Sequence, residues 1–279
     1  MKVLVTGYHG QLGYDVVKIS EKQGHEVLGT TREHFDLTDE VKIKEVIRNF
    51  KPDVVVHCAA YTLVDKAEDE KELCFAVNVL GTRYIAEACK EVNAKMVYIS
   101  TDYVFDGESN RPYEVSDKVN PVNYYGETKL LGEYEVLKTV PYHFIIRISW
   151  VFGENGNNFV KTMRRLAETR KELNVVGDQY GSPTYTKDLS NLISEMIQTD
   201  RYGIYHASNE GTCSWSEFAG AIFEYSGLAT RVNSITTEDY PTRARRPKSS
   251  IMSKDELEKN GFRRLPHWKD ALQRYLDEK

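Results

Sequence analysis

A tyrosine and a lysine four residues apart, Tyr125 and Lys129 in the stretch YYGETK, form a pair that could carry acid–base chemistry. On a helix, residues at this spacing share a face, so the two side chains would lie together. A positioned phenol can donate a proton, and a nearby ammonium favours the phenolate and lowers the pKa of the tyrosine. The pair therefore predicts a general acid.

Context selects among the four pairs with this spacing, which are Tyr14/Lys18, Tyr125/Lys129, Tyr134/Lys138 and Tyr275/Lys279. Tyr125 follows a loop that contains a proline and opens a predicted helix, which suits a side chain that faces a cleft. Tyr134 lies about half a turn round the same helix and faces elsewhere. Tyr14 follows a glycine loop, and Tyr275 is close to the chain end, where disorder is common. We expect Tyr125 and Lys129 to be the functional pair.

A strand-end hydroxyl supplies a third candidate. In YISTDYVFDG, Thr101 ends a predicted strand, and its hydroxyl could bond a substrate carbonyl while Tyr125 delivers the proton. A threonine at a strand end is commonly a cap or turn residue. Beside a Tyr–Lys pair and a glycine loop, however, the pattern favours a catalytic role.

The glycine loop is TGYHGQLG, in which Gly7, Gly10 and Gly13 follow the predicted strand 2–6 and precede a helix. Glycines allow a tight turn, close approach to a pyrophosphate and close helix–strand packing. The helix N-terminus adds free N–H groups and partial positive charge. A glycine turn without a ligand is the alternative, but the position between strand and helix predicts dinucleotide binding.

The residues at the end of the second predicted strand indicate whether the cofactor is NADH or NADPH. An acid there would bind the ribose 2′-hydroxyl of NAD. The chain instead reads Thr30, Thr31, Arg32, and Arg32 could meet a 2′-phosphate. The pattern favours NADPH, with NADH also accepted, although a surface arginine would look the same.

Alternating strands and helices indicate an α/β fold with a Rossmann-like, doubly wound parallel sheet. We expect strands at 2–6, 25–30, 53–59, 95–100 and 142–149, and helices at 38–50, with Thr38 as N-cap, and 67–92. Ligands bind beyond the carboxyl ends of such strands. Residues 1–150 would form the dinucleotide-binding domain, with 171–200 returning to it. Residues 151–279 would mainly form a smaller substrate-binding lobe.

Composition excludes several classes of protein. The net charge of −5 argues against a general nucleic-acid binder, apart from the basic run RARRPK at 243–248, which could equally be a solvated loop. The sequence contains no apolar run long enough to predict a membrane span, and its first apolar stretch is too short for a signal peptide. The four cysteines form no CxxC pair and read as free thiols in a reducing compartment. We expect a cytoplasmic protein.

The sequence resembles the extended short-chain dehydrogenase/reductases. The matching stretches run in family order from end to end: TGYHGQLG, FDLTD, HCAAYTLVDKAE, NVLGT, YISTDYVFDG, NYYGETKLLGE, RISWVFG, GNNFVKTM, DQYGSPT and ARRPKSS. Within the family, it is similar to members that act on dTDP-linked sugars. The resemblance implies reduction of the C4 keto group of dTDP-4-dehydro-L-rhamnose by NAD(P)H, a step in making cell-surface polysaccharide.

The resemblance also implies residue roles. The catalytic set would be Thr101, Tyr125 and Lys129. The cofactor would contact Tyr125 and Lys129 together with Gly7, Gly10, Gln11, Leu12, Gly13, Arg32, Asp36, Leu37, Ala60, Tyr61 and Thr62. The substrate would contact Thr101 and Tyr125 together with Asp102, Trp150, Asn158, Arg245 and Arg246. A guanidinium fork suits a diphosphate.

Alternatives remain within the same fold. A sugar-nucleotide epimerase or dehydratase shares the Tyr–Lys pair, but related dehydratases have Asp-Glu after the strand-end Thr, where this chain has Asp102-Tyr103. A non-catalytic, dinucleotide-binding regulatory subunit is a further alternative. Some relatives bridge a dimer through a metal. Here Asp15 could fill one ligand position but Lys187 replaces another acid, so we expect no metal and either a monomer or a homodimer.

Overall fold

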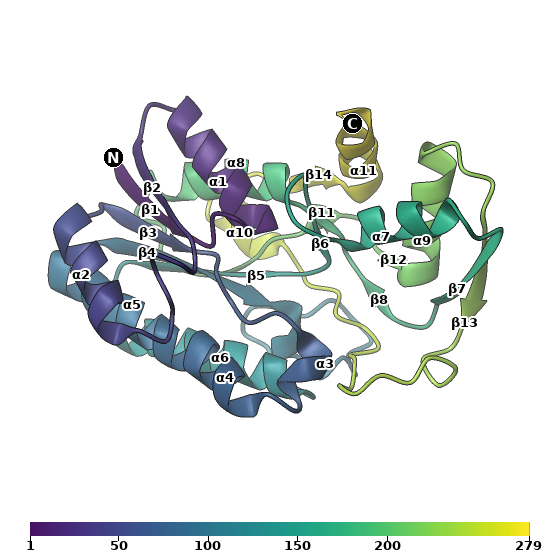
Figure 1. The fold of residues 1–279 in the computed structure, drawn as a ribbon, viewed down its shortest axis with the longest axis horizontal. Helices are drawn as coiled ribbons and strands as arrows, with labels where there is room; N and C mark the ends of the chain where they lie inside the picture. Colours follow the sequence, from purple (N-terminus) through teal and green to yellow (C-terminus); the bar gives the residue numbers. More distant parts are fainter. Residues whose placement is uncertain (279) are drawn as a thin grey trace.

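A six-stranded parallel sheet forms the centre of the larger lobe in the computed structural model, which describes residues 1–278 (Figure 1). Its strand order is β10-β5-β4-β3-β1-β2, and every neighbouring pair is parallel. The chain reverses direction across the sheet between β1 and β3, which is where such folds bind ligands. The strands are β1 (Lys2–Thr6), β2 (Glu26–Thr30), β3 (Val54–His57), β4 (Lys95–Thr101), β5 (His143–Ile148) and β10 (Gly203–His206).

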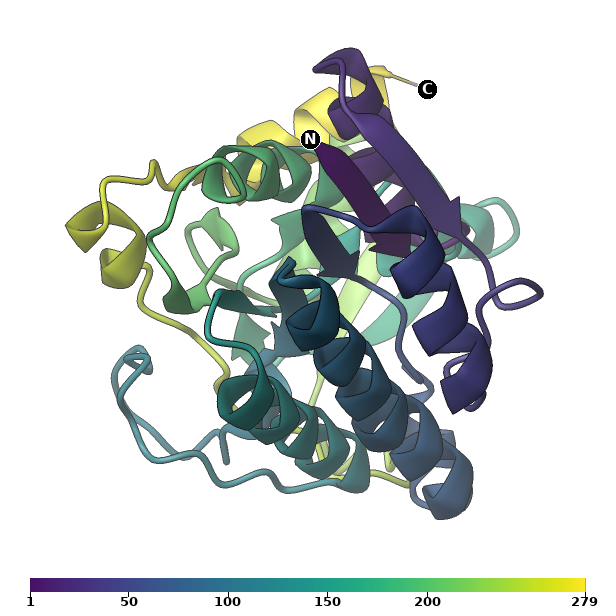
Figure 2. The ribbon, with the colours of Figure 1, turned by 90° about the vertical axis from the view of Figure 1, so that its left-hand side faces the viewer.

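Helices cover both faces of this sheet (Figures 1 and 2). One face carries α1 (Gln11–Lys22) and α8 (Thr186–Met196), and the other carries α2 (Glu40–Phe50), α5 (Gly81–Val92) and α6 (Tyr124–Thr139). Alternate strand residues serve the two cores: Val3 and Val5 pack with α1 and α8, whereas Leu4 packs with α2 and α5. The doubly wound parallel sheet predicted from the sequence is therefore confirmed.

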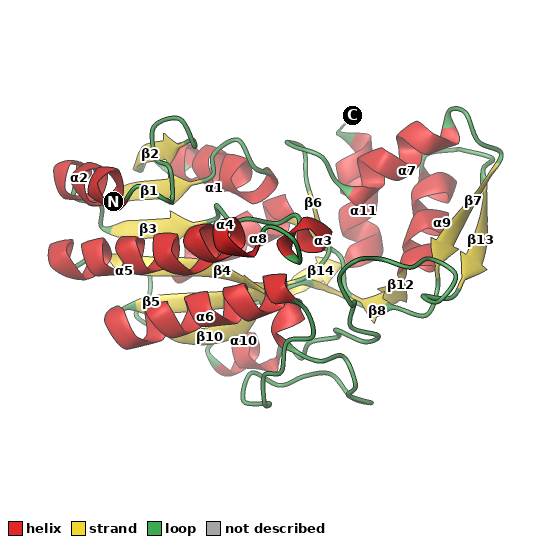
Figure 3. Cartoon of the chain, turned by 60° about the horizontal axis from the view of Figure 1, so that its bottom comes forward, coloured by secondary structure: helices red, strands yellow, loops and turns green. Residues whose placement is uncertain are grey.

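The second lobe is smaller (Figure 3), and its core contains many aromatic residues. Its parallel pair β7–β13 packs against α9, which also contacts α7 and α11. Three short strand pairs, β6–β9, β8–β12 and β11–β14, lie in the segments after β5. The bounds are β6 (Val151–Phe152), α7 (Phe159–Ala167), β7 (Glu172–Val176), β8 (Tyr180–Gly181), β9 (Thr184–Tyr185), β11 (Asn209–Glu210), β12 (Cys213–Ser214), α9 (Trp215–Tyr225), β13 (Arg231–Ile235), β14 (Leu265–His267) and α11 (Trp268–Asp277). Helix α10 (Asp255–Lys259) instead packs beside β10 of the main sheet.

Within the segment 171–200, which the sequence predicted to rejoin the first lobe, the elements divide between the lobes. Helix α8 packs against α1 of the first lobe, whereas β7 pairs with β13 in the second. Strand β10, further along the chain, extends the main sheet beside β5.

Two local predictions are wrong. The helix expected at 67–92 is broken into α3 (Val64–Ala67), α4 (Lys71–Phe75), a π-helical turn at Ala76–Leu80 and α5. The buried amide of Asn78 within the π turn bonds both the N–H and the C=O of Tyr61, which ties this turn to a loop outside the helix. Helix α2 is capped by Asp39, which accepts from Lys42 N, while Thr38 bonds Asp36 instead.

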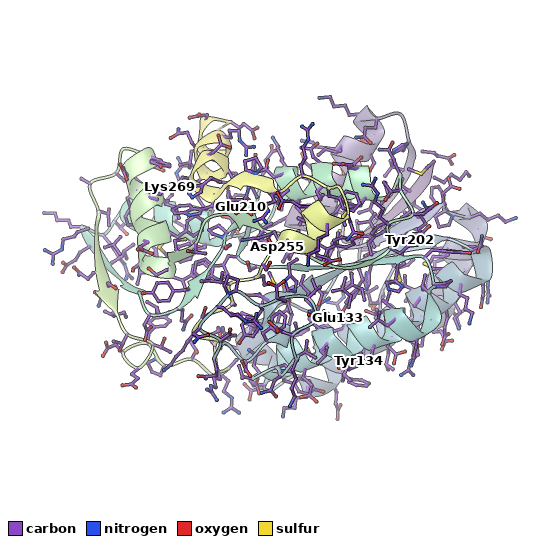
Figure 4. All side chains as sticks on the ribbon, turned by 180° about the vertical axis from the view of Figure 1, so that it is seen from behind. Glu133, Tyr134, Tyr202, Glu210, Asp255 and Lys269 are labelled. Atoms are coloured by element: carbon purple, nitrogen blue, oxygen red, sulfur yellow. The ribbon has the colours of Figure 1, made fainter. Side chains whose placement is uncertain are left out.

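Helix α6 is fixed to the sheet by a buried ion pair. Glu133, 1% exposed, accepts from Arg147 of β5 at 2.7 Å and from the hydroxyl of Ser100 in β4. Its neighbour Tyr134 is 47% exposed on the outer face of the helix (Figure 4). Gly132 lies directly over the Tyr98 hydroxyl of β4, so the absence of a side chain there allows the helix to approach.

Within residues 1–278, no helix is long and apolar enough to cross a membrane. The four cysteines are free, and all except Cys58 are buried.

Substituting Gly132 tests this close packing. A Cβ would overlap the Tyr98 hydroxyl and lie 2.8 Å from Asn78 O, so Gly132→Ala should lower the free energy of unfolding by ~1–3 kcal/mol. Gly220→Ala in α9 is the control, because a Cβ there meets nothing within 4 Å. It should stabilise by ~0.5–1 kcal/mol. Urea unfolding measures both, and equal effects would contradict the packing argument.

Candidate active site

A cavity of about 1000 Å³ lies at the carboxyl ends of β1, β3 and β4. Its wall includes residues of the glycine loop, of the loop after β3, of the end of β4 and of α6. Trp215 of α9 completes the wall from the second lobe. The cavity therefore lies between the two lobes and at the position where the sheet topology predicts a ligand.

The glycine loop forms a cradle that a side chain would fill. Gly7 has φ +75°, a backbone conformation suited to glycine, and a Cβ there would lie 3.0 Å from the backbone of Ala59. Gly13 packs against the carbonyl of Gly7, which brings α1 close to β1. Gly10 caps α1, and the N-terminus of this helix faces the cavity through Gln11 and Leu12. Of the five residues of this loop and helix start that were predicted to bind the cofactor, only Gly13 does not line the cavity.

The remaining predicted cofactor residues all line the same cavity. Arg32 is 81% exposed, and its Nε lies 3.7 Å from Asp36. Hydrogen bonds from Thr38 lower the pKa of Asp36 and keep this carboxylate charged. The other members of the set are Leu37, Ala60, Tyr61 and Thr62.

Thr101, Tyr125 and Asp102 meet at the end of β4. Tyr125 stands in the first turn of α6, where Asn123 accepts from Gly126 N as N-cap. The Thr101 hydroxyl donates to Asp102 Oδ1 at 3.0 Å and lies close to the Tyr125 phenol. Burial, followed by the nearby Asp102 carboxylate, raises the pKa of Tyr125, against the Thr101 hydroxyl, which lowers it. The phenol is therefore protonated at neutral pH, as a proton donor must be.

Lys129 also faces the cavity, but the pKa of Tyr125 is not lowered as the spacing predicted. Its ammonium lies 4.0 Å from the centroid of the Tyr98 ring, and the residue is 3% exposed. Burial lowers the pKa of Lys129 to about 7. The predicted lowering of the Tyr125 pKa is absent, because burial and Asp102 act in the opposite direction and dominate.

Asp102 is itself buried in the cavity wall. Burial raises its pKa to about 6, against the nearby hydroxyls of Ser250 and Thr101, which lower it. Thr101 donates to Oδ1, whereas Oδ2 is buried without a hydrogen-bond partner among the described residues. Ser250 ends the basic segment that begins at Arg243, so this segment reaches the catalytic strand end.

Three predicted substrate residues do not line the cavity. Arg245 pairs with Glu108 at 2.9 Å, and Arg246 pairs with Asp65 at 2.7 Å. Asn158 is the N-cap of α7 and donates to Gln11 Oε1 and to Gly153 O. Trp150, by contrast, lines the cavity as predicted.

Sequence reasoning missed several residues of the wall, and two of them, Tyr103 and Trp215, contact predicted site residues through their rings. Tyr103 follows Asp102 and places its ring edge against Tyr125, with the centroids 5.9 Å apart. Trp215 stacks on Trp150. The position of Tyr103 beside Thr101-Asp102 was a usable signal, but nothing in TCSWSEF connects Trp215 to a site in the first lobe.

The competing tyrosine pairs lie elsewhere. Tyr134 faces outward, and Lys18 lies above the Tyr14 ring at 4.2 Å on α1. Lys279 of the fourth pair lies outside the described residues. Asp15 is buried and accepts from Thr186, and Lys187 pairs with Glu278. Residues 1–278 contain no cluster of three or more metal-binding side chains.

The sheet topology, the glycine cradle and the Thr101/Tyr125/Lys129 set define an oxidoreductase of the extended short-chain dehydrogenase/reductase class. The whole chain, residues 1–279, matches the model of a family described as RmlD substrate binding domain. The chain belongs to this family.

Its relatives cover its full length. The spore coat polysaccharide biosynthesis protein SpsK of Bacillus subtilis is 44% identical, covering 100% of this chain and 98% of that protein. The dTDP-4-dehydrorhamnose reductase of Aggregatibacter actinomycetemcomitans is 40% identical and covers 97% of each. The crystal structure of dTDP-4-dehydrorhamnose reductase from Bacillus anthracis in complex with NADP has a TM-score of 0.98 at 42% identity, covering 100% and 99% of the two chains.

The lowered pKa of Lys129 predicts a pH-dependent gain in stability for Lys129→Met. The unfolded chain holds this proton up to its ordinary pKa of 10.5, whereas the folded protein releases it near 7. Lys129 therefore lowers the free energy of unfolding most below pH 7, and this destabilisation becomes smaller as the pH rises to 10.5. At ~1.4 kcal/mol per pKa unit, Lys129→Met should stabilise by roughly 2–5 kcal/mol at pH 7.

Urea unfolding at several pH values measures this gain, which should shrink toward pH 10. Lys118→Met, at an exposed loop position, is the control and should change stability little at any pH. A gain for Lys129→Met that is independent of pH would contradict the assignment.

Proposed function

We propose that this chain reduces the C4 keto group of dTDP-4-dehydro-L-rhamnose with NADPH to give dTDP-L-rhamnose. The observation that carries the proposal is the protonated phenol of Tyr125 beside the Thr101 hydroxyl, in the wall of a cavity that also contains a dinucleotide cradle. The names of the relatives supply the sugar nucleotide.

The chemistry follows from the positions of the side chains. Bound NADPH supplies the hydride to C4. Tyr125 donates its phenolic proton to the carbonyl oxygen, so the ketone becomes a secondary alcohol. Thr101 would hold that oxygen, since its hydroxyl lies beside the Tyr125 phenol in the cavity wall. Lys129, one turn along α6, stabilises the resulting phenolate when it is protonated and binds the nicotinamide ribose.

The residues present fit a dinucleotide. A Cβ at Gly7 or Gly13 would fill the cradle, and the N-terminus of α1 offers N–H groups to the pyrophosphate. The adenosine would lie toward Arg32, Asp36 and Leu37, and the ribose and phosphate toward Ala60–Thr62. The absence of an acid at Thr30–Thr31 supports NADPH over NADH.

The sugar would lie against Asp102 and Trp150, opposite the nicotinamide. Arg245 and Arg246 could reach a diphosphate only after exchanging their carboxylate partners, Glu108 and Asp65. Asn158 would act through Gln11. Tyr103 argues against a dehydratase, because related dehydratases have at this position a glutamate that serves as acid–base group in the elimination of water. A cytoplasmic location and a monomeric or homodimeric state complete the proposal.

The direct test is the oxidation of NADPH or NADH by the purified protein with dTDP-4-dehydro-L-rhamnose, followed by absorbance. Formation of dTDP-L-rhamnose supports the reductase. Cofactor binding without oxidation would favour a regulatory subunit, and a different sugar product would favour an epimerase or dehydratase.

Tyr125→Phe should lose the proton donor but keep the fold. We expect kcat to fall by ~10²- to 10⁴-fold, the range typical of general acid catalysis, with NADPH affinity unchanged. Tyr134→Phe is the matched control, since Tyr134 is exposed on the same helix and should retain full activity. Near-normal turnover by Tyr125→Phe would remove this residue from its proposed role.

Arg32→Gln tests the choice of cofactor. Loss of a charge-assisted hydrogen bond to the 2′-phosphate should raise the KM for NADPH by about tenfold or more, while the KM for NADH stays the same. Arg231→Gln, an exposed arginine on β13, should change neither value. An equal rise in KM for NADPH and for NADH would show that Arg32 does not bind the 2′-phosphate.

A further inference from the structure

Two indole rings, one from each lobe, stack in the wall of the cavity. Trp150 follows β5, and Trp215 is the first residue of α9. Their centroids lie 3.6 Å apart with an interplanar angle of 12°. Both side chains are half-buried and line the cavity that holds Thr101 and Tyr125. The stack is therefore part of the binding surface as well as of the contact between the lobes.

Trp150 has an unusual backbone conformation. Its φ of 47° is left-handed, which is uncommon for a bulky side chain. Neighbouring hydrogen bonds hold it: Thr184 N donates to Trp150 O at 3.1 Å, and the Ser149 hydroxyl donates to Ser182 O at 2.6 Å. Strained residues persist only where their surroundings fix them, and they cluster at ligand sites.

The position of Trp215 is fixed independently of Trp150. Ser214 and Glu217 form a capping box at the start of α9, and β12 pairs with β8 immediately before it. On its other side, Trp215 contacts Phe159 with the centroids 4.7 Å apart. The same strand pair brings Gly181 to the indole of Trp150, where a Cβ would approach to 2.7 Å. Gly181 and Trp215 together leave the Trp150 ring little freedom to rotate.

We propose that Trp215 is a positioning residue that holds Trp150 in the cavity wall, so that the sugar of the substrate lies against a fixed indole face. An aromatic face suits the apolar, methyl-bearing side of a 6-deoxysugar. The inference rests on the proposed function, because it takes Trp150 as a residue that contacts the sugar. Trp215 would therefore affect binding of the sugar but not binding of the nucleotide part of the substrate.

The test compares binding of dTDP-L-rhamnose and of dTDP by calorimetry. Trp215→Leu should weaken dTDP-L-rhamnose by about 5- to 10-fold, as expected for loss of an aromatic pair, and leave the Kd for dTDP and for NADPH unchanged. Trp215→Phe keeps a ring and should recover most of the lost affinity. General damage to the lobes would weaken dTDP and dTDP-L-rhamnose alike and would overturn the proposal.

Circular dichroism reports the stack itself. Stacked indoles give an exciton signal in the far ultraviolet, which both Trp215 variants should lose. Trp268→Phe is the control, because Trp268 is buried beside Phe218, away from the cavity wall, and should keep both the signal and the affinity. Loss of the signal in Trp215→Leu with unchanged affinity for dTDP-L-rhamnose would refute the positioning role. A wild-type protein that binds dTDP-L-rhamnose but reduces no keto sugar would refute the proposed function alone.

Discussion

The buried ion pair between Glu133 and Arg147 is the interaction on which the site depends. It joins α6 to β5, and the Ser100 hydroxyl adds β4, so one carboxylate ties together three elements. Removing one partner of such a pair leaves a buried charge uncompensated and costs ~3–5 kcal/mol. Glu133 lies one turn beyond Lys129, so the same attachment that holds the helix also fixes the depth of the lysine. The lowered pKa of Lys129 is a consequence of this depth.

A second set of buried polar contacts links the helix to the cofactor side. The amide of Asn78 bonds both backbone groups of Tyr61 and the hydroxyl of Thr128, which in turn donates to Tyr125 O. The loop after β3 and the first turn of α6 are therefore held in one network. A fully satisfied buried network of this kind makes local geometry specific. The predicted cofactor loop and the proton donor cannot move independently of each other.

Much of this structure could be predicted because its signals are local. The apolar strands and the glycine loop indicated the sheet and its ligand edge, and the Tyr125/Lys129 spacing indicated a shared helix face. The direction of the Tyr125 pKa shift was not predictable, because burial and the position of Asp102 arise from tertiary packing. The π turn at Asn78 and the place of Trp215 depend on partners outside their own helices, Tyr61 and Thr128 for Asn78 and Trp150 for Trp215. Arg246 lies off the cavity wall for the same reason, since its carboxylate partner comes from α3.

The basic segment 243–250 differs from the rest of the site in what holds it. Arg243 and Arg245 pair with carboxylates through groups that are more than half exposed. Such pairs contribute ~0–1 kcal/mol each, far less than the buried contacts beneath α6. The backbone of the segment, by contrast, is held by hydrogen bonds: Asn123 donates to Arg245 O, and Ser250 N donates to Tyr180 O. The two exposed arginine side chains can therefore exchange their carboxylate partners for a charged ligand while the backbone of the segment stays in place.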